Sequence, residues 1–205
     1  MQVEQVITYL ELTSLEELVP GEPAEGVTFE EVAWDNDFLR ALHDRVGAVC
    51  RWSSVEWSPT IWREHVSKPT MRHWIIRIEE QPAGLLSVVA RDHGETEIDM
   101  FGLVPEYIGK GHGGHVLTCA AKLAWETRSS DGASVQKIVL HTSSFDHPNA
   151  LPNYKRRGFR VIATETKMRE IRERDGRLPE TQQIHARAGY YPDMFERDGP
   201  FFYPK

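Results

Sequence analysis

The order of hydrophobic and polar residues predicts a strand followed by two helices in the first third of the chain. Loose alternation over 2–11 indicates a strand. From Asp35, hydrophobic residues recur at helical spacing behind an Asp/Asn cap, which predicts a helix ending near 47–49. A second, short helix is expected after Ser58 and Pro59, because a Ser-Pro pair is a common helix start.

A run of strands is expected next. The segments 73–80 and 82–92 are extended, hydrophobic and separated by a short turn, so they predict a hairpin. A third strand follows over 96–105 and closes at a proline. The polar stretch 12–26, rich in Pro and Gly, is expected to be a connection.

The remaining pattern predicts one crossover between strands. An amphipathic helix is expected over 114–126, a buried strand over 137–142, a short helix over 149–158 and a strand over 159–168. The predicted order combines a meander with one strand–helix–strand unit. This order predicts an α/β fold with a mixed sheet.

Composition narrows the class of protein. A chain of 205 residues suits one domain, 1–205. The net charge of −7 argues against a nucleic-acid partner, and the apolar runs are too short to cross a membrane. With two cysteines and no basic flank before an apolar run near Met1, we expect a reduced, cytoplasmic protein without a disulfide framework.

The segment 107–115, YIGKGHGGH, is the clearest candidate binding site. A strand that leads through glycines into a helix directs backbone N–H groups and the positive end of the helix dipole at one point, where anions bind. Its glycines also fit G-x-G-x-x-G, but a dinucleotide site needs an acidic residue after the next strand, which ends VLHT at 139–142. The phosphate-loop pattern G-x-x-x-x-G-K-[ST] is absent.

Two motifs carry a family resemblance. The first is LVPEYIGKGHG at 103–113, and the second is HPNALPNYKRRGF at 147–159. With both motifs, the segment 96–162 resembles the acyl-CoA-binding half of the GNAT superfamily of N-acetyltransferases. Ile108 stands where the family usually has Arg or Gln, and His147 where it has Asn.

The resemblance implies a fold and an activity. The fold is a mixed, mostly antiparallel sheet of six or seven strands with about four helices and a splayed parallel strand pair. The CoA-binding core would span about 95–162, and 165–205 would be an extension that packs on the domain or on a second subunit of a homodimer. The activity is transfer of an acetyl group from acetyl-CoA to a primary amine of a small molecule or peptide, by direct attack in a ternary complex. The alternatives are transfer to a hydroxyl, a longer acyl-CoA, or a CoA-binding regulator without turnover.

The resemblance also assigns cofactor contacts. Backbone groups of Leu103 and Val104 would bind pantetheine, and His147 and Asn149 stand where its arm is oriented. The pyrophosphate would be held by backbone N–H groups from the following residues: Gly109, Lys110, Gly111, His112, Gly113 and Gly114.

A carboxylate on the strand before the glycines is the candidate general base. Glu97 has the spacing at which related enzymes carry their base, and Asp99 is the alternative. Period-two alternation predicts that these two share one face of the strand and that Ile98 and Met100 share the other. A solvent-facing pair of carboxylates is the non-catalytic interpretation.

Tyr154 is the candidate acid. It matches the family tyrosine whose hydroxyl points at the CoA sulfur, and a phenol can protonate a departing thiolate; the alternative is a core tyrosine. Trp52, Trp57 and Trp62 lie in the region that walls the acceptor site in the superfamily, or belong to the core. The nine histidines show no familiar ligand spacing, so no metal is expected.

Overall fold

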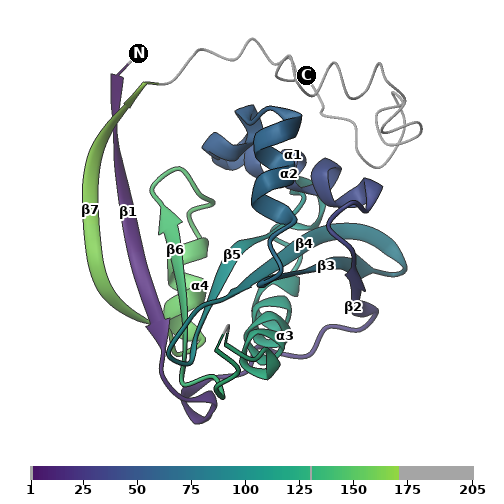
Figure 1. Cartoon of the computed structure of the whole chain (residues 1–205), viewed down its shortest axis with the longest axis vertical. Coiled ribbons are helices and arrows are strands. Elements are labelled where there is room, and N and C mark those ends of the chain that lie inside the picture. The colour runs from purple at the N-terminus through teal and green to yellow at the C-terminus, as the bar shows by residue number, and fades with distance from the viewer. Residues whose placement is uncertain (1, 130, 171–205) are drawn as a thin grey trace.

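The computed structural model describes residues 2–129 and 131–170, which form one seven-stranded sheet with helices on both faces (Figure 1). The strands are β1 (Gln2–Leu12), β2 (Val27–Val32), β3 (Met71–Ile78), β4 (Gln81–Ala90), β5 (Glu95–Leu103), β6 (Lys137–Ser143) and β7 (Arg160–Glu170). The α-helices are α1 (Asp37–Cys50), α2 (Pro59–Val66), α3 (His112–Glu126) and α4 (Ala150–Arg156). The expected α/β class, sheet size and helix number are confirmed.

One parallel pair interrupts an otherwise antiparallel sheet of order β2-β3-β4-β5-β6-β1-β7. The parallel pairing of β5 with β6 ends at Ile98 and Leu140, although the strands continue to Leu103 and Ser143. Both strands therefore have an unpaired stretch facing the gap between them. This is the expected splayed pair.

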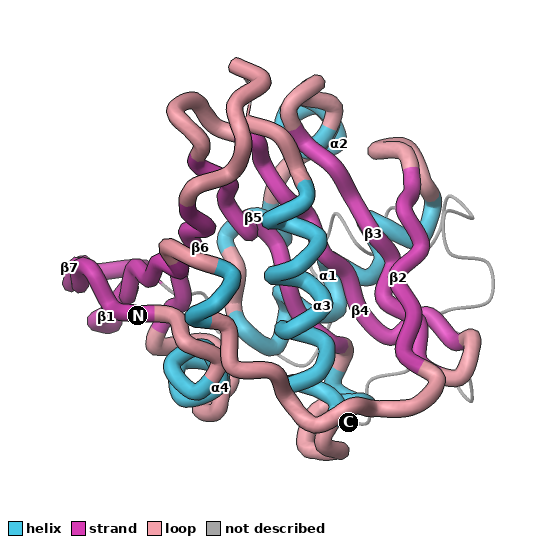
Figure 2. Tube along the Cα trace, turned by 90° about the horizontal axis from the view of Figure 1, so that it is seen from below, coloured by secondary structure: helices cyan, strands magenta, loops and turns pink. Residues whose placement is uncertain are grey.

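Local signals fix the helix ends close to where the sequence placed them. The Asn36 side chain accepts a hydrogen bond from the Phe38 N–H at the start of α1. At α2, the Ser58 side chain caps the helix and Pro59 is its first residue. Helix α3 lies on one face of the sheet, and α1 and α2 lie on the other (Figure 2).

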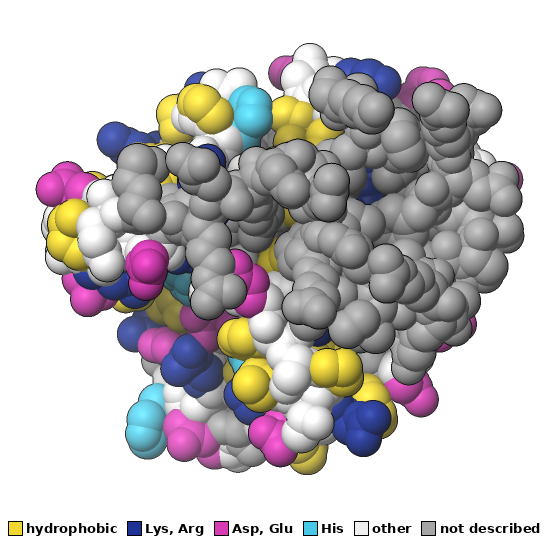
Figure 3. All heavy atoms as spheres, turned by 90° about the horizontal axis from the view of Figure 1, so that it is seen from above, with side chains coloured by type: hydrophobic (Ala, Val, Ile, Leu, Met, Phe, Trp, Pro, Cys, Tyr) yellow, Lys and Arg dark blue, Asp and Glu magenta, His cyan; other side chains and the backbone are white. Residues whose placement is uncertain are grey.

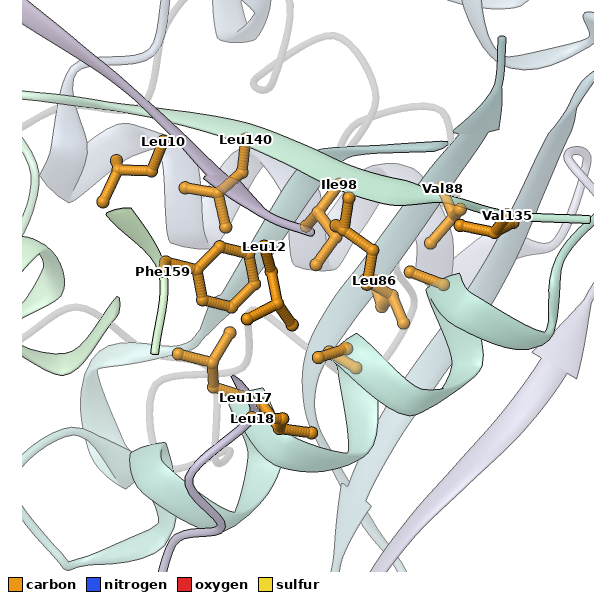
Figure 4. Packing of buried hydrophobic residues seen from close by; sticks show 14 of the residues in the cluster. Leu10, Leu12, Leu18, Leu86, Val88, Ile98, Leu117, Val135, Leu140 and Phe159 are labelled. Carbon is orange, nitrogen blue, oxygen red and sulfur yellow. The ribbon is translucent and has the colours of Figure 1, made fainter. Parts of the chain in front are cut away.

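Each face of the sheet has its own hydrophobic cluster. On the α3 side, Leu12, Leu117 and Phe159 pack with side chains from the central strands (Figure 4). On the other side, residues of α1 and α2 such as Leu42 and Trp62 pack on β3, β4 and β5. The sheet is thereby held between two cores, which keeps the ends of β5 and β6 in place.

A bulge at Asp99 changes which side chains of β5 share a face. Val88 pairs with Ile98 and Ser87 pairs with Met100, so Asp99 is the extra residue on β5. Ile98 consequently belongs to the cluster on the α3 side, whereas Met100 belongs to the cluster on the α1 side. The prediction that Ile98 and Met100 share a face is wrong, because strict alternation does not hold across a bulge.

Other features of the sheet were not predicted. Strand β2 lies in a segment for which no element was expected, and β1 inserts between β6 and β7. The strand expected over 159–168 is β7, which continues to Glu170, so the first residues of the expected extension 165–205 belong to the sheet. The rest of that extension, 171–205, lies outside the described residues. Across the described part of the chain, no helix is long and apolar enough to span a membrane.

Candidate active site

A cavity of about 870 Å³ opens where β5 and β6 separate. Its walls come from the loop before α3, the start of α4, the segment joining α1 to α2, and the ribbon of β1 and β7. These segments are far apart in the sequence, and the splayed strands bring them together. The cavity passes from the α3 side of the sheet towards the α1 side.

The glycine loop, residues 107–114, borders the cavity at the N-terminus of α3. Gly109 and Gly111 have φ values of +79° and +89°, and an added Cβ would meet no atom within 4 Å at either position. Their backbone therefore faces open space, in a conformation that other residues adopt at a cost. The first N–H groups of α3 have no partner within the helix, so this loop can hold an anion.

Two side-chain hydrogen bonds, one from α4 and one from within α3, hold the end of the loop in place. The Asn153 side chain donates to the Gly113 carbonyl at 3.0 Å, and the Thr118 hydroxyl donates to the Gly114 carbonyl at 2.9 Å. Both bonds use carbonyl groups. The Tyr107 and Ile108 N–H groups donate to the Val104 and Pro105 carbonyls, so the N–H groups that can face the cavity are those that follow Ile108.

The structure brings most of the predicted cofactor residues to the cavity. The residues that line it are Leu103, Gly109, Gly111, Gly113, Gly114, His147 and Asn149. Val104, Lys110 and His112 are not among its lining residues. The Lys110 ammonium lies 5.6 Å from the centre of the Tyr107 ring, and the His112 ring lies 6.4 Å from it.

The backbone of β5 offers hydrogen-bonding groups to the cavity at Leu103 but not through the Val104 N–H. Val104 donates its N–H to the Ala83 carbonyl at 2.9 Å, and its side chain is buried. Because alternate residues of an antiparallel strand direct their N–H and C=O groups to opposite neighbours, Leu103 and Phe101 face the gap instead. A ligand in the gap could therefore form hydrogen bonds with backbone groups of Leu103 and Phe101.

Helix α4 presents Asn149 and Tyr154 to the cavity. Asn149 is at the N-cap position, but its side chain makes no capping bond and can contact a ligand. Pro152 falls at the third helical position, where its missing N–H costs little.

Tyr154 lies between the core and the cavity. Its ring meets Phe159 edge-on at 6.1 Å and packs against the cluster on the α3 side, while the residue also lines the cavity. Burial raises the pKa of Tyr154 above its ordinary value. The phenol consequently keeps its proton at neutral pH, which a proton donor requires.

Glu97 is held in an ion-pair cluster away from the cavity lining. Arg91 Nε donates to its Oε2 at 2.9 Å, and His141 Nδ1 lies 3.8 Å from its Oε1. Burial favours a higher pKa for Glu97, but the neighbouring His141 and Arg91 cations outweigh it and lower the pKa. Glu97 pairs with Val89, which packs on the α1 side, so this cluster lies on the α1 face of the sheet. A low pKa and a tight partner make a carboxylate a poor proton acceptor.

Asp99 is the second candidate carboxylate of β5, and its partner is the imidazole of His65. Both residues line the cavity. His65 Nε2 lies 2.9 Å from Asp99 Oδ2, and the two side chains are 21% and 17% exposed, respectively. His65 was missed by the sequence analysis. The sequence does give one indication of a role for His65. This polar residue lies three positions after Trp62 and one before Val66, beside the side chains that α2 buries.

The three tryptophans divide between the cavity and the core. Trp52 and Trp57 line the cavity, and the Trp57 ring lies 4.8 Å from the His65 ring. Trp62 is buried in the cluster on the α1 side. Aromatic walls beside a carboxylate suit a cationic amine.

Cys50 also lines the cavity. Burial raises the pKa of its thiol to about 11, so it is protonated at neutral pH. A protonated thiol is a weak nucleophile. A covalent acyl-cysteine is therefore not favoured here.

Comparisons with known proteins agree with this geometry. The family model described as "Acetyltransferase (GNAT) family" matches residues 30–159. Among solved structures, a GCN5-related N-acetyltransferase from Kribbella flavida has a TM-score of 0.56 at 20% identity, over 82% of this chain and 58% of that one. A functionally unknown conserved protein from Staphylococcus epidermidis has a TM-score of 0.54 at 16% identity, over 82% and 62% of the two chains.

A third similar structure, a GCN5-related N-acetyltransferase from Sphaerobacter thermophilus, has a TM-score of 0.53 at 14% identity, over 80% of this chain and 51% of that one. This chain thus spans between half and two thirds of the length of these structures. At such identities the likeness shows the fold alone. A search of curated proteins found no match.

Proposed function

The chain belongs to the GNAT family of acetyltransferases, and from this premise we propose that it transfers an acetyl group from acetyl-CoA to a primary amine. The observation that carries the proposal is the cavity, which extends from a glycine loop that can hold an anion to a region walled by Asp99, His65 and Trp57. The first part suits the pyrophosphate of CoA and the second suits an amine. Acetyl-CoA would lie between them, in the gap between β5 and β6.

Direct attack of the amine on the thioester is the proposed route. The amine nitrogen forms a bond to the acetyl carbon, the carbon–sulfur bond breaks, and the sulfur leaves with the electron pair. Tyr154 gives its proton to the thiolate, and Asp99 accepts the proton lost by the amine, directly or through a water. The raised pKa of Cys50 supports this route over an acyl-cysteine intermediate.

Asp99 replaces Glu97 as our first candidate for the base. Asp99 borders the cavity with His65 against one of its oxygens, whereas Glu97 is bound by Arg91 and has a lowered pKa. In this proposal His65 is a positioning residue that orients the Asp99 carboxylate. Transfer to a hydroxyl or from a longer acyl-CoA uses the same groups and stays an alternative, as does CoA binding without turnover.

Two measurements test the proposal. Acetyl-CoA should raise the melting temperature, since a ligand that binds only the folded state stabilises it. A panel of amines should then release free CoA thiol in the presence of the protein and acetyl-CoA. Stabilisation by CoA without thiol release from any amine would favour the regulator, and acetylation of alcohols alone would favour the hydroxyl acceptor.

A further inference from the structure

Two cations on β7 line the cavity beside β1. Lys167 pairs with Gln5 and Arg169 pairs with Val3. Residues two apart in a strand point to the same side, so Lys167 and Arg169 share a face. Both line the cavity, as does Gln5. The part of this face that borders the cavity is therefore a basic wall, formed by Lys167 and Arg169. Glu165 shares the face but does not line the cavity, and its carboxylate accepts a hydrogen bond from the Tyr9 hydroxyl at 3.1 Å.

This basic wall lies on the α1 face of the sheet, the face on which Asp99, His65 and Trp57 form the proposed amine site. The Tyr9 ring of β1 is 6.0 Å from the His141 ring, which belongs to the cluster around Glu97 on the α1 face. Gln5 is four residues from Tyr9 on the same strand and so shares its side. The glycine loop begins α3 on the opposite face. Lys167 and Arg169 are thus placed for the acceptor and not for the pyrophosphate.

No acidic side chain in the part of the chain that the structure describes forms an ion pair with the two cations of the basic wall. Within residues 2–129 and 131–170, no carboxylate lies within 4.0 Å of Arg51, Lys167 or Arg169, all of which line the cavity. The Arg169 guanidinium lies 5.8 Å from the centre of the Phe145 ring. Acidic and basic side chains intermingle over the coloured surface at this end of the molecule (Figure 3).

The acceptor half of the cavity has charges of opposite sign in different walls. Asp99, on β5, attracts an ammonium, and Trp57 beside it stabilises a cation. The cations on β7 attract an anion, and their N–H groups can donate charge-assisted hydrogen bonds to it. We infer that the acceptor is an amine that also carries a carboxylate or phosphate, bound by Lys167 and Arg169. This inference rests on the proposed acyl transfer and narrows its substrate class.

The test uses acceptors that differ only in the anionic group. A series of ω-amino acids of increasing length is compared with the matching ω-amino carboxamides and ω-amino phosphonates, by thiol release at saturating acetyl-CoA. One chain length should match the span between Asp99 and the basic wall. At that length we expect kcat/KM for the anionic acceptor to exceed that for the carboxamide by roughly 10- to 100-fold. The carboxylate and phosphonate arms distinguish the two anions.

Variants then locate the anion site. Lys167→Ala/Arg169→Ala should raise KM for the anionic acceptor by about the same factor. The KM for the carboxamide and the Kd of CoA should stay nearly unchanged. The matched control is Lys122→Ala/Arg128→Ala, which removes two exposed cations that do not line the cavity. A melting curve with CoA verifies that each variant is folded and binds the cofactor.

Each outcome separates the inference from the function beneath it. Equal rates with carboxamides and anionic acceptors at every length would overturn the inference and leave acyl transfer standing. Weaker CoA binding in Lys167→Ala/Arg169→Ala would assign the basic wall to the cofactor and also overturn it. Absence of thiol release from every amine, despite CoA binding, would instead remove the proposed function.

Discussion

His65 Nε2 lies 2.9 Å from Asp99 Oδ2, and this contact joins helix α2 to the bulged part of β5. The bulge makes the contact possible because it takes Asp99 out of the regular pairing with β4, where Val88 and Ser87 pair with its two neighbours. A carboxylate is thereby placed at the point where β5 and β6 separate. Glu97, two residues earlier, is still within the regular sheet and is bound by Arg91.

The first prediction compares the two carboxylates. Asp99→Asn should lower kcat/KM at neutral pH by about 10²- to 10⁴-fold, the usual contribution of a general base. The defect should shrink as the pH rises, because the fraction of amine that is already neutral in solution grows. Glu97→Gln should keep rates near those of the wild type. Full pH–rate profiles of both variants, with one amine, make the comparison.

The reverse result would restore the expectation from the sequence. If Glu97→Gln shows the pH-dependent defect and Asp99→Asn does not, Glu97 is the base and the Asp99–His65 pair is structural. His65→Gln adds a further check. If His65 only positions Asp99, its substitution should lower kcat less, and change the pH profile less, than Asp99→Asn does. Melting temperatures and CoA affinity of the three variants control for misfolding.

The second prediction concerns Tyr154. Tyr154→Phe keeps the ring that packs on Phe159, so the melting temperature and the Kd of CoA should stay close to wild type. Turnover should fall by roughly 10²-fold or more, because the thiolate then leaves without a proton donor. Since burial raises the pKa of Tyr154 above 10, the wild-type rate should show no alkaline loss from this group below about pH 10. Parallel losses of CoA affinity and rate would point to packing instead.

Much of the fold follows from local patterns in the sequence. The hairpin of β3 and β4, the capped starts of α1 and α2, and the glycine loop before α3 all depend on residues close together in the chain. The position of β1 between β6 and β7 does not, because it depends on pairings such as Ile7 with Ser143 across more than a hundred residues. Strand β2 was missed for a different reason. Half of its residues are exposed, so its pattern of hydrophobic and polar residues is weak.

The site was predictable only where backbone groups define it. The glycines of the loop carry their own signal, since positive φ and close approach need glycine. The side chains that meet because of the bulge have no such signal in the sequence. Strict alternation makes Glu97 and Asp99 equivalent, and no pattern indicates that Asp99 contacts His65. The cations Lys167 and Arg169 also look like ordinary exposed strand residues until β7 is placed beside the cavity.

The third prediction concerns the pair of Glu97 and His141. The Glu97 carboxylate raises the pKa of His141 above 6.5, and the pKa of Glu97 is lowered below 4.5. Their mutual stabilisation is therefore fully present between about pH 4.5 and 6.5 and is lost as the pH rises through the His141 pKa. The difference in unfolding free energy between wild type and Glu97→Gln should fall over that rise by about 0.2–1 kcal/mol, as for partly exposed pairs.

NMR titration of His141 supplies the direct measurement. In Glu97→Gln its pKa should move down towards the ordinary value, whereas in Asp99→Asn it should move less, because Glu97 makes the larger contribution. A His141 pKa that is the same in wild type and Glu97→Gln would show that the two side chains do not interact in solution.

The last prediction separates backbone strain from ligand binding with two glycines. Gly111 and Gly132 have φ values of +89° and +81°, and an added Cβ would meet no atom within 4 Å at either site. Alanine should thus destabilise the free protein similarly at both, by about 1–2 kcal/mol, the cost of a left-handed backbone.

Of the two glycines, only Gly111 borders the cavity, at the start of α3. The methyl group of Gly111→Ala, and any shift of the loop, would displace N–H groups from the pyrophosphate. Isothermal titration should show a Kd for CoA raised roughly 10- to 100-fold in Gly111→Ala, the loss expected for one or two hydrogen bonds to a charged group, and unchanged in Gly132→Ala. Equal CoA affinity in the two variants would place the pyrophosphate away from this loop, because the strain is matched and only the position of the methyl group differs.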